Sequence, residues 1–186
     1  MSRPEPLFPL FADLETLPGV GPKVARAFAG MGVARPRDLL FVLPHSGIDR
    51  SRVSTVQGAA LPGTVTVEVT VGAHYPSQTK NRPYRIQVRD AAVDFQLAFF
   101  HARGEYLMKL LPPGARRVLS GRVELFDGIA QMVHPDHILE PEDAADLPPY
   151  EPVYPLTAGL TQRVMGKSVA AALARLPIVP DRKSVV

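Results

Sequence analysis

Hydrophobic and polar residues alternate through the middle of the chain, which is the pattern of half-buried β-strands. Between residues 64 and 71, threonine and glutamate alternate with the valines at positions 65, 67, 69 and 71. Further strands are predicted at residues 84–89, 93–100, 117–125 and 129–133, and Phe126-Asp127-Gly128 predicts a tight hairpin turn before the last of them. The middle of the chain is therefore expected to contain five strands.

A short helix is predicted at residues 105–111, between the third and fourth strands, and Pro112-Pro113-Gly114 ends it. Three strands, a helix and two strands is the order of an OB barrel, which binds oligonucleotides on its second and third strands and the adjoining loops. The main alternative, an SH3-like barrel, lacks that helix. The expected fold class is mainly β with α: a five-stranded OB-type barrel preceded by a helical segment and followed by a linker and a C-terminal helix.

Short helices with glycine and proline between them are expected ahead of the barrel. Residues 18–28 (PGVGPKVARAF) place Pro22 at the first position of a helix, which is typical of a helix-hairpin-helix. Its glycines allow a tight turn, so that free amides at the helix N-terminus can face a phosphate oxygen. The predicted phosphate contacts here are Gly19, Gly21, Lys23 and Arg26. The alternative is a turn that merely joins two packed helices.

The pattern divides the chain into successive segments. Residues 1–60 are the helical segment, with a further helix at 36–42, and residues 61–139 are the barrel. Residues 140–158 are acidic and proline-rich, so they are expected to form an extended linker. Residues 159–180 follow, with a helix at 161–176.

Positive charge is concentrated in the barrel. The chain has a net charge of +3, but residues 76–122 hold nine Lys or Arg against three acids, whereas residues 136–151 hold six acids and no Lys or Arg. A basic block fits a phosphate-binding face, because neutralised phosphates release counterions; a merely solvated barrel surface is the alternative. The chain has no cysteine, which excludes disulfides and thiolate metal sites and suits the cytoplasm. No apolar run approaches the ~18 residues of a membrane-spanning helix.

Adjacent aromatic residues end the third strand. Side chains alternate along a strand, so one of Phe99 and Phe100 is expected to point away from the barrel core and to stack on a base; the alternative is that both pack. Further aromatic contacts are predicted at Tyr75, Tyr84 and Tyr106. The predicted phosphate contacts of the barrel are Lys80, Arg82, Arg85 and Arg103.

Catalytic chemistry is not expected. Gly166-Lys167-Ser168 has the ending of a phosphate-binding loop, but the required glycine five residues earlier is replaced by Thr161. His134 and His137 have no third ligand at a metal-site spacing, and no serine has the context of a nucleophile. No catalytic residue, metal or cofactor is therefore predicted for this chain.

Several short motifs together resemble the N-terminal wedge domain of RecG, a bacterial ATP-dependent helicase family that remodels stalled replication forks. The resemblance covers nearly the whole chain, and the order of the motifs makes it specific. They are residues 17–23 (LPGVGPK), 38–44 (DLLFVLP) with Asp49-Arg50, Phe99-Phe100, 121–123 (GRV), 131–135 (QMVHP) and 153–160 (VYPLTAGL).

The resemblance implies a DNA-binding wedge that acts at forks and Holliday junctions in recombination and repair. It implies as partners branched DNA, single strands at the branch, and C-terminal motor domains that would use ATP and Mg²⁺ in the full-length helicase. Phe99 and Phe100 match the paired aromatics of the family's wedge. This chain has no Walker motifs, so we expect it neither to hydrolyse ATP nor to unwind DNA alone, and we expect a monomer in the bacterial cytoplasm.

Two further expectations remain open. Residues 181–186 (DRKSVV) back-translate to a common sequencing-library adapter, which predicts a non-native tail. A stand-alone OB module that binds single strands or a protein partner is the alternative to the wedge. A wedge should prefer forks and junctions to plain single strands, whereas a general single-strand binder should not.

Overall fold

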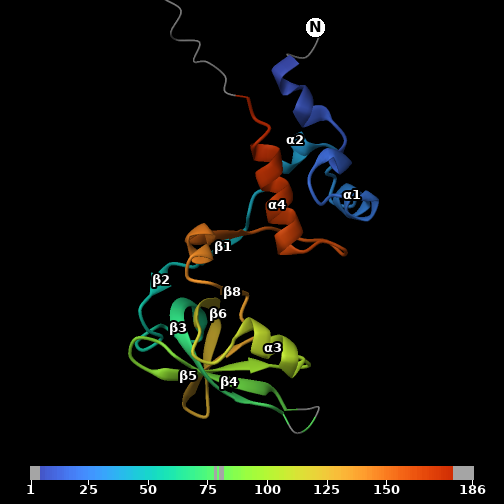
Figure 1. Ribbon diagram of the computed structural model, residues 1–186. Helices are drawn as coiled ribbons and strands as arrows, with labels where there is room; N and C mark the ends of the chain where they lie inside the picture. The colour runs from blue at the N-terminus through green and yellow to red at the C-terminus, as the bar shows by residue number, and fades with distance from the viewer. Residues whose placement is uncertain (1–4, 78, 80–81, 178–186) are drawn as a thin grey trace, which may run out of the picture. The chain divides into compact units, whose positions relative to one another are not determined.

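The computed structural model describes residues 5–77, 79 and 82–177 (Figure 1). These residues belong to two units: Met1–Gly47 with Pro152–Val186, and Ile48–Glu151. Lys80 and the predicted tail at 181–186 lie outside the described residues. No helix among the described residues is long and apolar enough to cross a membrane.

The unit formed by Ile48–Glu151 contains the predicted barrel. Its strands hydrogen-bond in the order β3-β4-β5-β7-β6, and β6 returns to pair with β3, which closes the barrel. The β5–β7 pair is parallel and the other pairs of the barrel are antiparallel. The five-stranded OB-type fold is therefore confirmed. The strands are β3 (Gly63–Tyr75), β4 (Tyr84–Arg89), β5 (Asp94–Phe99), β6 (Arg116–Phe126) and β7 (Ile129–Val133).

The alternating valines of β3 point into the barrel, where all four are buried. Helix α3 (Gly104–Leu110) lies between β5 and β6 in the chain, and Leu107 and Leu111 pack into the same core (Figure 1). Short strands extend the sheet: β2 (Arg52–Val53) pairs with β3 and β8 (His137–Leu139) pairs with β6.

The outer side of β3 departs from the simple alternation. Thr66 faces outward and is nevertheless fully buried, and its hydroxyl lies 2.7 Å from that of Ser120 on β6. Arg50, only 4% exposed, covers this pair and donates to the Ser120 hydroxyl at 2.8 Å. It also donates to Glu151 Oε2 at 2.5 Å and to Asp136 Oδ2 at 3.1 Å. We call these five residues the Arg50 cluster.

The other unit joins segments from both ends of the chain. Its elements are η1 (Glu5–Phe11), η2 (Leu14–Thr16), α1 (Pro22–Ala29), α2 (Pro36–Leu39) and α4 (Gln162–Leu173). Phe28 and Leu39 share one buried core with Met165 and Ala172, and α4 packs beside α2 (Figure 1). The sequence pattern predicts residues 1–60 and 159–180 as separate segments. In the structure, the apolar faces of the N-terminal helices and of α4 pack together in one core.

Two segments differ in the structure from what the sequence predicts. Helix α2 is shorter than the expected 36–42, because the amides of Phe41 and Val42 bond to carbonyls three residues back and form a turn instead. The linker is not simply extended: it contains the 3₁₀ turn η3 (Asp143–Asp146) and β9 (Tyr150–Val153), which pairs with β1 (Ser46–Asp49).

Candidate nucleic-acid interface

The two adjacent phenylalanines at the end of β5 face different environments. Phe99 pairs across the strands with Tyr84, and both point into the barrel, where they are 7% and 8% exposed. Burial raises the pKa of the Tyr84 phenol, whose oxygen lies 2.9 Å from His74 Nδ1. Phe100 is 39% exposed. Of the aromatic side chains predicted to contact DNA, Phe99 and Tyr84 are therefore core residues, and Phe100 is the member of the adjacent pair that points outward, as alternation predicts for one of the two.

His134 fixes the backbone at Phe100. It follows β7, adopts a positive φ of 46° and donates its amide to Ala98 O at 3.0 Å. Its ring Nε2 accepts the Phe100 amide at 3.0 Å. The ring centroid lies 6.1 Å from that of Phe100 and 5.7 Å from that of Phe99. The sequence around His134 suggests a metal ligand or a family signature and gives no sign of this positioning role.

An open cleft of about 580 Å³ lies beside Phe100. Pro135 and Leu107 contribute apolar surface to its lining. Tyr106, on the first turn of α3, is 62% exposed, and Arg103, the residue just before that helix, is exposed as well. Exposed rings beside a guanidinium offer stacking surfaces for bases and a charge for phosphate.

The cations of the barrel divide into paired and unpaired groups. Arg89, Arg116 and Arg117 form ion pairs with Asp94, Glu68 and Glu140. In contrast, the predicted phosphate contacts Arg82, Arg85 and Arg103 are exposed, and no carboxylate of the described residues pairs with them. Tyr75 is also exposed and donates its hydroxyl to Gln87 Oε1 at 3.3 Å.

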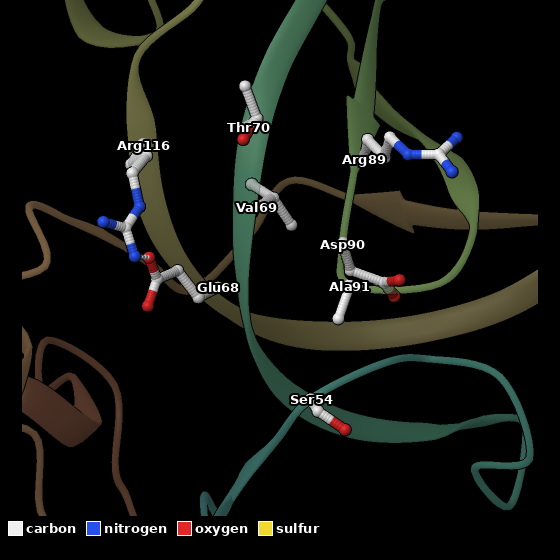
Figure 2. Close-up of a pocket in the computed structure, with 8 residues that line it drawn as sticks. All are labelled: Ser54, Glu68, Val69, Thr70, Arg89, Asp90, Ala91 and Arg116. Carbon is white, nitrogen blue, oxygen red and sulfur yellow. Dashed lines mark ion pairs between the residues drawn. The ribbon is translucent and has the colours of Figure 1, made fainter.

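A second cavity, of about 380 Å³, lies where β3 passes between β4 and β6 (Figure 2). Thr70 of β3 is opposite Arg89 on one side and Arg116 on the other. Figure 2 shows the ion pair that joins Arg116 to Glu68, and Arg89 bonds to Asp94 at 3.1 Å. Because both guanidiniums are already paired, this cavity is a poorer phosphate site than the surface around Arg85 and Arg103.

The predicted hairpin lies in the other unit. Gly19 has a φ of 78°, which favours glycine, and Gly21 caps α1 with Pro22 at its first position. The first helical bond runs from Ala25 N–H to Gly21 O, so the preceding amides of α1 have no partner within the helix. Lys23 is exposed, and Arg26 Nε donates to Pro22 O at 3.3 Å, toward this end of the helix. The arrangement suits a phosphate.

A comparison with protein families shows which family this chain belongs to. The family model described as "RecG wedge domain" matches residues 13–176. The chain belongs to the RecG wedge domain family. The match includes both the hairpin and the aromatic cleft.

Individual RecG proteins agree with this assignment. The ATP-dependent DNA helicase RecG of Pasteurella multocida is 27% identical over 165 residues, and that of Streptococcus pneumoniae is 29% identical over 168 residues. Each alignment covers 88% of this chain, which spans about a quarter of the length of these relatives (24% and 23%). A solved structure of RecG bound to a three-way DNA junction has the same fold, with a TM-score of 0.72 and 22% identity over 93% of this chain and 25% of that one.

Proposed function

We propose that this RecG wedge chain binds branched DNA at stalled forks and Holliday junctions during recombination and repair. The observation that carries the proposal is the cleft in which exposed Phe100 and Tyr106 flank Arg103. Rings held on a rigid barrel next to an unpaired guanidinium suit a point where bases lose their partners while their phosphates stay charged. The solved RecG structure bound to a three-way DNA junction supports this reading.

In the proposed complex, Phe100 and Tyr106 stack on unpaired bases, and the cations contact phosphates. Stacking on an aromatic side chain contributes roughly 1–3 kcal/mol per base and tolerates any sequence. Arg82, Arg85 and Arg103 would contact phosphates beside the barrel, and Gly19, Gly21, Lys23 and Arg26 would do so at the hairpin. The proposal for Lys80 rests on sequence alone. The His134 ring supports stacking indirectly, because it holds the Phe100 backbone.

The named relatives are ATP-dependent helicases, so we propose that this wedge works with C-terminal motor domains that bind ATP and Mg²⁺. The wedge would part the strands while the motor moves the duplex. A wedge that acts by stacking and phosphate contact needs no cofactor and no catalytic residue of its own.

The test is fluorescence anisotropy with a three-way fork, a matched duplex and a matched single strand at two salt concentrations. We expect the fork to bind most tightly, and Phe100→Ala and Tyr106→Ala each to weaken fork binding by about 1–3 kcal/mol without changing the salt slope. Arg103→Gln should instead lower the slope by about 1, because one phosphate contact is lost.

Phe41→Ala is the matched control, because Phe41 is a highly exposed phenylalanine in the other unit. It should leave fork binding unchanged. Equal affinity for all three DNAs, or equal effects of Phe100→Ala and Phe41→Ala, would contradict the proposal. Equal affinity combined with tight single-strand binding would favour the stand-alone single-strand binder.

A further inference from the structure

A half-buried histidine near the end of β3, His74, connects the barrel to the helix that lines the open cleft beside Phe100, here called the Phe100 cleft. We infer that His74 is a positioning residue for DNA binding, which holds α3 in place and so sets the spacing between Phe100 and Tyr106. The inference rests on the proposed function, because this spacing matters only if both rings stack on bases. In this role His74 acts through α3 and not by contact with DNA.

The Phe100 cleft has two walls that come from different parts of the barrel unit. The residues that follow β5 and β7 supply one wall, with Phe100 and Pro135. Helix α3 supplies the other, with Tyr106, Leu107 and Leu110. Rings that stack on DNA bases bind best when their spacing is fixed in advance, so affinity depends on where α3 lies against the barrel.

Helix α3 is too short to hold its own position. It has seven residues, and isolated helices shorter than about 12–15 residues are marginal in water. Bonds from two barrel strands reach the carbonyls at its C-terminal end. Arg117 of β6 donates its Nε to Leu110 O at 3.0 Å. His74 of β3 donates its Nε2 to Leu111 O at 2.8 Å, since a carbonyl can only accept.

A β-bulge in β3 turns His74 toward this helix. Regular pairing with β4 would place Ala73 opposite Ile86, but one extra residue in β3 brings His74 there instead. Ile86 is fully buried, so His74 points toward the barrel interior, whereas Ala73 is exposed. Bulges often redirect a side chain next to a functional site, and this one brings a polar ring to the end of α3.

Tyr84 extends the contact to the other end of α3. Its hydroxyl lies 2.9 Å from His74 Nδ1, and the two rings meet edge to face with centroids 5.6 Å apart. Its ring packs against Gly104, the first residue of α3, where a Cβ would lie 3.1 Å from Tyr84 Cε2. His74 and Tyr84 therefore contact α3 at both ends. An apolar side chain at position 74 could fill the same space, but it would leave the Tyr84 hydroxyl and the Leu111 carbonyl without this partner.

A double-mutant cycle on fork affinity separates positioning from simple stabilisation of the fold. His74→Phe keeps a ring but removes both hydrogen bonds. Anisotropy should show that it weakens fork binding about 5-fold or more, up to the loss caused by Tyr106→Ala. In a Tyr106→Ala background it should have less than about a 2-fold further effect, because the ring that it positions is gone. A histidine that only stabilises the fold would change affinity by the same factor in both backgrounds.

Thr66→Val is the matched control for destabilisation of β3. It removes a buried side-chain hydrogen bond from the outer face of the same strand, so it should lower stability and leave fork binding unchanged. Tyr84→Phe is the second variant if His74→Phe does not fold. It removes only the hydroxyl that contacts His74, and it should weaken fork binding in the same direction, by less, and again only while Tyr106 is present.

Amide hydrogen exchange without DNA tests the anchoring of α3 directly. His74→Phe should speed exchange at residues 107–111 relative to β7, whereas Thr66→Val should not. Unchanged exchange in α3, wild-type fork affinity of His74→Phe, or an equal loss in the two backgrounds would each overturn the role of His74 while fork preference remains intact. Equal affinity for fork and duplex would instead overturn the proposed function and the positioning role with it, even if α3 exchanges faster.

Discussion

Replacing the buried Arg50 should destabilise the barrel unit, because one guanidinium satisfies three oxygen acceptors. We consider Arg50→Met, which keeps an unbranched apolar stem but removes the guanidinium and its charge. The substitution leaves Glu151 and Asp136 without their charged partner. It also removes the donor to Ser120, whose hydroxyl stays bonded to Thr66 in the buried interior.

The size of the effect follows from how exposed the remaining groups are. Removing one partner of a buried ion pair typically costs about 3–5 kcal/mol. Here the side chains of Glu151 and Asp136 are 31% and 51% exposed, so water can partly replace the guanidinium. We therefore expect a loss of about 2–4 kcal/mol in the free energy of unfolding. The Ser120 hydroxyl contributes little to this sum, because it keeps its bond to Thr66.

Urea unfolding followed by far-UV circular dichroism measures this loss. Arg89→Met is the matched control, because Arg89 also pairs with an acid but at an exposed position, where such pairs contribute at most about 1 kcal/mol. The reasoning is refuted if Arg50→Met costs no more than Arg89→Met. That result would mean that the Arg50 cluster only fills space.

Two further predictions concern Asp90, in the loop between β4 and β5, and Gly121, on β6. Burial raises the pKa of the Asp90 carboxyl, but hydrogen bonds from the amides of Val93, Ala92 and Val56 lower it by more, so the pKa is lowered overall. The ionised carboxylate therefore stabilises the fold at pH values above its unfolded pKa of about 3.9. This stabilisation is lost as the pH falls through the folded pKa. Asp90→Asn should cost about 1–3 kcal/mol at pH 7 in urea unfolding, and the difference from wild type should shrink below about pH 4; a difference that stays constant with pH would contradict it. A methyl group at Gly121 would lie 3.1 Å from Met132 Sδ and 3.1 Å from Pro135 Cα, so Gly121→Ala should cost about 1–3 kcal/mol and weaken fork binding by shifting the loop beside Phe100. Gly166→Ala, with open space around it in α4, should instead be neutral or stabilising, and equal melting temperatures of the two variants would refute the steric argument.

The barrel could be predicted from the sequence because its core depends on alternation, a local property. Val65 to Val71 point inward as their spacing predicts, and the order of strands and helix restricts the fold to an OB type. The turn at Asp127-Gly128 was also predictable, since tight hairpins select such residues.

Features that depend on contacts distant in sequence were not predictable in the same way. Alternation shows that one of Phe99 and Phe100 points outward, but the choice depends on strand register, which pairs Phe99 with Tyr84 inside the barrel. The burial of Thr66 depends on Arg50 and Ser120, which are far from it in the chain. Likewise, α4 shares a core with the N-terminal helices although most of the chain separates them.

The difference between inward and outward positions of the barrel explains where binding surfaces can occur on this fold. Inward positions of the barrel strands must be apolar and closely packed, so they leave no freedom for binding chemistry. Exposed positions at strand ends and on α3 carry no such requirement, and there the chain places Phe100, Phe126 and Tyr106, although exposing aromatic rings to water is unfavourable. Phe100 in addition has its backbone held by a histidine from another strand end. An exposed ring held in this way fits the proposed function, because an unpaired DNA base offers the flat apolar surface that the ring lacks.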